Sequence, residues 1–173
     1  LTTLALNLSP NPYAAFEIFF WLMGSLTDRS LTHVGLALPF ILVGIGMLMT
    51  TGRSLDALTL GEDVAQSLGI GLFGLQTRVV VGTALAVGAS VSVAGVIGFV
   101  GLVVPHLLRP MVGQRPSRLL IVSAPGGGAL TLAADTLVRF AGNGPELHLG
   151  VLTALIGAPF FLALVLKIRR EGA

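Results

Sequence analysis

The chain is 173 residues long and has too few charged side chains to cover a soluble globule of that size. Charged residues make up 10% of the sequence, hydrophobic residues make up 54%, and the mean hydropathy is +0.92. Soluble domains carry roughly 25% charged residues. The composition therefore predicts lipid as the solvent, and the formal net charge of +2 gives no reason to expect a nucleic-acid partner. The chain has no cysteine, which excludes a disulfide framework and a thiolate metal site.

The first 26 residues hold a short apolar stretch and then an aromatic, amphipathic one. Residues 1–8 are too short to cross a bilayer and indicate the tail of a helix. They follow no charged leader, so we expect a chain that starts inside a longer protein. Residues 12–26 predict a short interfacial helix, because aromatic side chains favour the membrane–water boundary. Its aromatic residues are Tyr13, Phe16, Phe19, Phe20 and Trp21.

Four further segments have the length and hydropathy of membrane-spanning helices. They are residues 33–50, 79–99, 119–138 and 147–166. A fifth apolar stretch, 97–108, is too short to span alone and follows the second segment directly. This pattern predicts a helix that crosses, turns at residues 95–98 and returns part of the way, with Pro105 inside the returning piece. Neighbouring protein must shield Pro105, because its missing N–H leaves a carbonyl unpaired.

Positive charge predicts which side of the membrane each loop occupies. Basic residues gather in alternate connections: Arg53 and Arg78; Arg109, Arg115 and Arg118; and Lys167, Arg169 and Arg170. The other side holds only Arg29 and Arg139, each near an acidic residue. Basic loops face the cytoplasm, so this alternation supports the returning helix and predicts a cytoplasmic C-terminus.

The longest predicted cytoplasmic loop, residues 52–78, has the pattern of two short helices that meet at Gly61. Gly61 is a suitable N-cap for the second helix, acidic residues follow in its first turn, and Gly69 ends it. The acidic residues are Glu62 and Asp63, and the apolar face is formed by Val64, Ala65 and Leu68. Helices that lie on lipid headgroups are usually rich in Lys and Arg. The acidic surface therefore favours a protein partner over lipid.

Charged and polar residues near the membrane offer few chemical sites. Asp135 and Arg139 have the favourable i,i+4 order, either as an ion pair that anchors the helix end or with Arg139 turned outward to dock an acidic partner. The histidines lack metal-ligand spacing, and His106 is expected to be a structural hydrogen-bonding residue. Residues 126–128 are glycines without the following Lys of a phosphate loop, so they indicate a close helix contact or a kink. No nucleotide-binding or catalytic motif is present, so if this protein moves a substrate uphill, the energy must come from another chain or an ion gradient.

Several stretches together resemble the FecCD-type permease subunits of binding-protein-dependent ABC importers for iron-siderophores, heme and cobalamin. They are FWLMGSL at 20–26, LTLGEDVAQSLGI at 58–70, SVAGVIGFVGLVVPHLLR at 92–109, LAADTLVR at 132–139 and ELHLGVLTALIGAPFF at 146–161. The resemblance implies an all-α, polytopic transmembrane helical bundle. It covers nearly all of this chain but about the C-terminal half of a ten-helix permease. Residues 1–173 would then be part of one transmembrane domain, with 52–78 as its cytoplasmic coupling loop.

The resemblance also implies roles for single residues. Those that would couple to the ATPase are Leu58, Leu60, Gly61, Glu62, Ala65, Leu68 and Gly69. Arg139 would pair with a glutamate of the substrate-binding protein, and structural roles would fall to Pro105, His106, Arg109 and Asp135. The last helix would help to line the pathway. No catalytic residue, metal ligand or cofactor is implied, because ATP would be hydrolysed in a partner chain.

The implied protein is a multi-pass component of the bacterial cytoplasmic (inner) membrane. Its partners would be an ABC ATPase, a periplasmic or lipoprotein substrate-binding protein, membrane lipid and a second permease subunit in a homodimer or a paralogous heterodimer. Transport would proceed by ATP-driven alternating access. The alternative is half of an ion-coupled secondary carrier, or a helical membrane subunit that transports nothing. Asp135 weighs against the carrier because it lies near a helix end beside Arg139, whereas a break at residues 126–128 would favour it.

Overall fold

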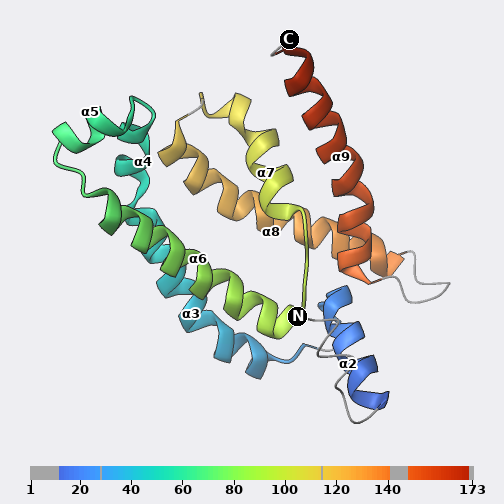
Figure 1. Ribbon diagram of the computed structural model, residues 1–173. Coiled ribbons are helices and arrows are strands. Elements are labelled where there is room, and N and C mark those ends of the chain that lie inside the picture. Colours follow the sequence, from blue (N-terminus) through green and yellow to red (C-terminus); the bar gives the residue numbers. More distant parts are fainter. Residues whose placement is uncertain (1–11, 28, 114, 141–147, 172–173) are drawn as a thin grey trace.

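The computed structural model (Figure 1) describes residues 12–27, 29–113, 115–140 and 148–171, and all regular elements in these ranges are helical. This confirms the predicted all-α class. In chain order the elements are α2 (Pro12–Met23), α3 (Leu31–Thr50), α4 (Gly52–Leu58), α5 (Glu62–Ser67), α6 (Leu72–Ala94), α7 (Val100–Leu108), the 3₁₀ turn η1 (Arg109–Met111), α8 (Pro116–Phe140) and α9 (Leu149–Glu171). The predicted helix tail at 1–8 and the predicted start of the last span at 147 lie outside the described residues.

Four of these helices are long and apolar enough to cross a membrane, namely α3, α6, α8 and the Leu149–Lys167 part of α9. Several predicted boundaries were wrong, including the end of α6, which lies at Ala94 rather than 99, and the end of α9, which lies at Glu171 rather than 166. Helix α6 begins at Leu72 rather than at residue 79, because Arg78 is part of the helix instead of ending the loop. A long arginine side chain can extend from a membrane helix to the interface, so its charge does not mark where the helix starts. Helix α8 begins at Pro116 rather than at 119, since the fixed φ of proline suits the first helical position.

The chain turns back after α6, as predicted, and α7 is the short returning helix. The turn begins at Gly95, with φ 72°, and ends at Phe99, with φ 64°. Helix α7 continues past Pro105 and His106 to Leu108, where the predicted stretch 97–108 also ends, and then passes into η1. Side chains of α7 contact α8 and α9, and this packing can hold a helix together across a proline.

Helices α3 and α6 form an antiparallel pair that crosses at small residues. A side chain at Gly44 would collide with the Gly82 carbonyl oxygen and the backbone of Ala86. A side chain at Gly82 would in turn meet the Gly44 carbonyl oxygen at 3.0 Å and the Leu48 side chain at 3.1 Å. Small residues let membrane helices approach closely, so this crossing relies on the absence of side chains at two facing positions.

A second set of glycines joins three segments that are far apart in the sequence. Gly24 follows α2, Gly95 follows α6, and Gly150 lies in the first turn of α9. A side chain at Gly24 would strike the Val96 carbonyl oxygen, and one at Gly150 would strike the carbonyl oxygens of Met23 and Val96. Backbone hydrogen bonds also connect the segments: the Ser25 N–H donates to the Ala94 carbonyl at 2.8 Å, and the Gly150 N–H donates to the Gly24 carbonyl at 3.3 Å. We call Gly24, Gly95 and Gly150 the glycine junction.

The helix ends sort into two groups (Figure 1). One group contains the α4–α5 loop, the connection from α7 to α8 and the C-terminal end of α9. The other contains the glycine junction, the end of α8 and the start of α3. The first group, here called the basic end, carries Arg53, Arg115, Arg118 and Lys167. The loops predicted to share one side of the membrane therefore lie at the same end of the bundle.

We expect Gly95→Ala to lower the melting temperature of the detergent-purified protein by at least about 5 °C. The alanine Cβ would be held at a positive φ and would strike the Trp21 carbonyl oxygen, which together cost about 2 kcal/mol or more. The matched control is Gly98→Ala in the same turn, where no atom lies within 4 Å of the added Cβ. Equal melting temperatures for the two variants would show that the glycine junction does not need its close backbone contacts.

Candidate functional site

The α4–α5 loop has the predicted architecture of two short helices separated at Gly61. Gly61 is the N-cap of α5 with φ 106° and ψ 154°, a conformation that is accessible essentially only to glycine. Its carbonyl accepts the Ala65 N–H at 3.1 Å, which starts the helix. Gly69, with φ 83°, follows the last turn, and its N–H donates to the Gln66 carbonyl at 2.8 Å. Two glycines therefore determine where α5 begins and ends.

The predicted coupling residues do not share one environment. Ala65 is completely buried, whereas Leu60 and Leu68 are 66% and 64% exposed. Leu58 is half-buried, and Gly61, Glu62 and Gly69 are exposed. Ala65 therefore packs inside the loop and cannot touch a partner. Val64, which lies beside Ala65 and was not among the candidate residues, is 44% exposed and adds to the apolar surface.

Asp56 of α4 makes a contact that the sequence analysis missed. Its carboxylate accepts the backbone N–H of Ser117 at 2.8 Å and the Ser117 hydroxyl at 2.5 Å. Ser117 is the second residue of α8, so the carboxylate caps the start of a predicted membrane-spanning helix. These two hydrogen bonds from Ser117 lower the pKa of Asp56 below the usual 3.8, and Arg115 and Arg118 nearby contribute less. Asp56 is therefore charged at neutral pH.

The residues at the start of α8 indicate that this helix needs a cap from another part of the chain. Arg115 immediately precedes α8, and its carbonyl accepts the Leu119 N–H at 3.0 Å, as an N-cap carbonyl does. Arginine has no side-chain acceptor, so it cannot satisfy the free N–H groups of the first turn. A helix that begins with Arg-Pro-Ser needs an acceptor from elsewhere. The sequence does not say which of its acidic residues provides it.

Asp135 and Arg139 form the ion pair that their spacing predicted. The Arg139 Nε donates to Asp135 Oδ2 at 2.7 Å, near the end of α8 that is opposite the basic end. The Arg139 side chain is 60% exposed, whereas Asp135 is only 15% exposed. The two interpretations are therefore compatible, because the buried acid holds the arginine in place while the guanidinium remains open to a partner.

The other candidate residues are structural contacts in the described geometry. The His106 ring meets the Phe160 ring edge-on, with centroids 5.6 Å apart, and so joins α7 to α9. This ring contact is a structural role for His106, and its predicted hydrogen bond stays a prediction. Arg109 begins η1, and its carbonyl accepts the Val112 N–H at 3.4 Å. Among the described residues, no three His, Cys, Asp or Glu side chains gather in a group that could hold a metal ion.

The glycine run at 126–128 is a helix contact and not a break. Helix α8 is continuous from Pro116 to Phe140. A side chain at Gly126 would collide with Leu108 of α7 and come within 3.0 Å of the Val104 side chain. The prediction of a close helix contact is confirmed, and the feature that favoured an ion-coupled carrier is absent from this helix.

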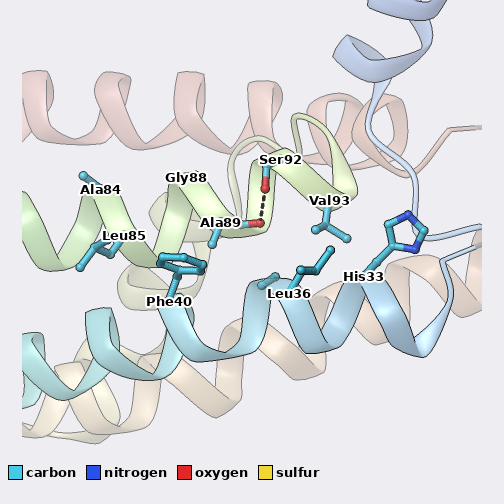
Figure 2. Close-up of a pocket in the computed structure, with 10 residues that line it drawn as sticks. His33, Leu36, Phe40, Ala84, Leu85, Gly88, Ala89, Ser92 and Val93 are labelled. Atoms are coloured by element: carbon cyan, nitrogen blue, oxygen red, sulfur yellow. Dashed lines mark hydrogen bonds between the residues drawn. The ribbon is translucent and has the colours of Figure 1, made fainter.

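An open groove of about 520 Å³ lies between α3 and α6 (Figure 2). It is lined by His33, Leu36, Ala37, Phe40, Ala84, Leu85, Gly88, Ala89, Ser92 and Val93. The Ser92 hydroxyl donates to the Ala89 carbonyl at 2.9 Å, and His33 Nδ1 pairs with the Ser30 hydroxyl at 2.8 Å at the start of α3. The two polar lining residues are therefore satisfied within their own helix or cap. The groove presents an apolar wall without a catalytic or ligating group.

We expect Gly61→Ala to loosen α5 without disturbing the membrane helices. Alanine at φ 106° is strained by about 1–3 kcal/mol, although no atom lies within 4 Å of its Cβ. Gly71→Ala is the matched control, because Gly71 also caps a helix in open space but has an ordinary φ of −74°. Hydrogen exchange at the α5 amides should rise about tenfold or more in the first variant only. Unchanged exchange in Gly61→Ala would show that the turn does not depend on glycine.

Comparison with known proteins places this geometry in a family. The model of the FecCD transport family matches residues 1–167. The chain is 43% identical over 151 residues to a vitamin B12 import system permease protein of Vibrio cholerae, covering 87% of this chain and 45% of that protein. It is 40% identical over 155 residues to a hemin transport system permease protein of Yersinia pestis, covering 90% of this chain and 46% of that protein.

A solved structure gives the same result. A metal-chelate type ABC transporter in an inward-facing conformation superimposes with a TM-score of 0.85 at 32% identity, covering 95% of this chain and 53% of the matched chain. The chain spans about half the length of the curated relatives it matches. Because the family match extends over nearly the whole sequence and the fold agrees, the chain belongs to the FecCD transport family.

Proposed function

We propose that this chain is part of the transmembrane permease of a binding-protein-dependent ABC importer in the bacterial cytoplasmic membrane. One observation carries the proposal: the bundle presents an exposed apolar loop at its basic end and an exposed arginine at the opposite end. An importer of this kind must contact an ATPase on one side of the membrane and a substrate-binding protein on the other. The relatives named for vitamin B12 and hemin import support cobalamin, heme or iron-siderophore as the substrate class.

The α4–α5 loop is the proposed ATPase-docking surface. Leu60, Val64 and Leu68 expose apolar area at the end of the bundle that carries most of the positive charge. Glu62 and Asp63 give the same surface an acidic edge, which suits a protein groove better than anionic lipid. Buried Ala65 and the two glycines shape the loop, and the exposed side chains make the contact.

The opposite end is the proposed docking site for the binding protein. Arg139 is exposed and oriented by the Asp135 carboxylate, so less side-chain entropy is lost when it meets an acidic partner. A planar guanidinium with several N–H donors can bind a carboxylate through two parallel bonds. One guanidinium nitrogen, Nε, already donates to Asp135, which leaves the terminal nitrogens for the partner.

Transport in this proposal requires no bond chemistry in the chain itself. ATP binding closes the partner ATPases, the α4–α5 loop moves with them, and the attached helices alternate between inward and outward openings. The apolar walls of the bundle suit a large chelate that is recognised mainly by the binding protein. A second permease subunit, identical or paralogous, completes the pathway. The ion-coupled carrier is the weaker reading, because α8 is unbroken and Asp135 is paired.

The loop assignment predicts that Leu68→Glu abolishes copurification of the ATPase with the intact permease. A charge would then replace an exposed leucine in an apolar contact, at a cost of about 2 kcal/mol or more. Gln66→Glu adds the same charge to an exposed position nearby in the same loop and should retain at least half of the ATPase. Full ATPase recovery with Leu68→Glu would place the docking surface elsewhere.

The arginine assignment predicts that Arg139→Glu weakens the binding protein's affinity for the permease at least about tenfold, because like charges would face each other. Arg139→Lys should lose less, since it keeps the charge but not the two-pronged geometry. Surface plasmon resonance with nanodisc-embedded permease would measure both, and ATPase copurification serves as the folding control. An unchanged affinity in Arg139→Glu would remove Arg139 from the interface.

A further inference from the structure

We propose that Asp56 is a positioning residue that fastens the coupling loop to α8, so that loop movement reaches α8 through the Asp56–Ser117 hydrogen bonds. The inference rests on the proposed function, because it assumes that the α4–α5 loop docks the ATPase. It adds a residue on α4 and a receiving helix to that function. Neither the family resemblance nor the loop pattern pointed to this contact.

The contact joins parts of the chain that the backbone does not connect directly. Helix α4 follows α3 after one residue, and α5 leads into α6, so the backbone ties the loop to both helices of that pair. Ser117 lies 61 residues beyond Asp56. The loop can therefore act on α8 only through noncovalent contacts, and the Asp56–Ser117 hydrogen bonds are the polar ones.

The surroundings of the bond are close-packed. Thr51, immediately before α4, is only 1% exposed. A Cβ added at Gly52 would lie 3.2 Å from the Ser117 Cβ, so the start of α4 rests directly against the start of α8. Asp56 lies one helical turn further along α4 and reaches the same residue with both carboxylate oxygens. Ser117 is hydrogen-bonded at two atoms and packed against the α4 backbone, so it cannot move independently of α4.

The chemistry of the contact makes it suitable for transmitting movement. A carboxylate that accepts a backbone N–H at a helix start is a charge-assisted bond, about twice as strong as a neutral one. The positive end of the α8 dipole and the nearby Arg115 and Arg118 also favour the charged carboxylate. Because Arg115 provides no cap of its own, loss of Asp56 leaves α8 with unsatisfied donors in its first turn.

Helix α8 is a suitable receiver because it extends from one proposed docking site to the other. Its 25 residues span about 37 Å at 1.5 Å per residue. Asp56 holds its first turn, and Arg139 lies in its last turn. Pro125 removes one backbone hydrogen bond in the middle of α8, but the helix runs without a break from Pro116 to Phe140, so a displacement of its first turn would reach the end that carries Arg139.

The test uses the intact permease reconstituted in proteoliposomes with its ATPase and its binding protein. Asp56→Ala removes both acceptor oxygens, so it should retain ATPase copurification and basal hydrolysis but lose at least about fivefold of the stimulation by substrate-loaded binding protein. Ser117→Ala should lose less, because the backbone N–H bond remains, and Ser117→Thr should preserve stimulation because it keeps the hydroxyl. Glu17→Gln removes an exposed carboxylate from α2 and should leave stimulation unchanged.

A disulfide between α4 and α8 tests whether Asp56 acts by linking the two helices or only by stabilising the fold. The chain has no cysteine, and the 3.2 Å separation at Gly52 and Ser117 is within a few tenths of an ångström of disulfide geometry. In Asp56→Ala, the added pair Gly52→Cys and Ser117→Cys should restore stimulation when oxidised and lose it again on reduction. The oxidised pair replaces the hydrogen bonds with a bond that needs no carboxylate.

Two outcomes would overturn the inference. The first is wild-type stimulation in Asp56→Ala, and the second is a variant that stays uncoupled after the disulfide has formed. A different result marks failure of the proposed function: if wild type captures no ATPase, the loop is not a docking surface, even when the cysteine pair cross-links and so verifies the contact between α4 and α8.

Discussion

The close approach of three backbone segments at the glycine junction is the constraint on which the arrangement of the bundle depends. At this junction the ends of α2 and α6 meet the start of α9, with carbonyl oxygens where side chains would otherwise lie. Backbone groups at membrane depth must find partners within the protein. The bonds from Ser25 to Ala94 and from Gly150 to Gly24 provide such partners between segments. With that junction in place, the chain can leave α6 and return as α7 between its neighbours.

Different interactions hold the helices together at the two ends of the bundle. The glycine junction relies on backbone proximity, which permits almost no relative movement without a collision. At the basic end, a charged side chain of α4 holds the first turn of α8 through two hydrogen bonds. This link holds the start of α8 against α4 through one side chain and leaves the two backbones unbonded to each other. In the proposed function, α4 and the start of α8 would move together while the glycine junction holds the opposite end.

The parts of the candidate site that depend only on residues close together in sequence could be predicted. The i,i+4 spacing of Asp135 and Arg139 was enough to predict their pairing, because a helix brings those positions together whatever surrounds it. Gly61 and Gly69 likewise marked the ends of α5 through their own backbone preferences. Burial was not predictable from the same pattern: Ala65 and Leu68 belong to one apolar face in sequence, but only Leu68 is exposed.

The sequence by itself determined the all-α class, the four membrane-length helices, the returning α7 and the side of the membrane predicted for each loop. These follow from hydropathy, glycine, proline and charge, whose effects act within about twenty residues of the chain. Only the tertiary structure decided that Asp56 caps α8, that the Leu108 side chain packs against Gly126, and that α7 continues past Pro105. Each of these depends on which helices become neighbours, and an apolar helix in lipid carries little information in its hydropathy about which neighbour it will meet.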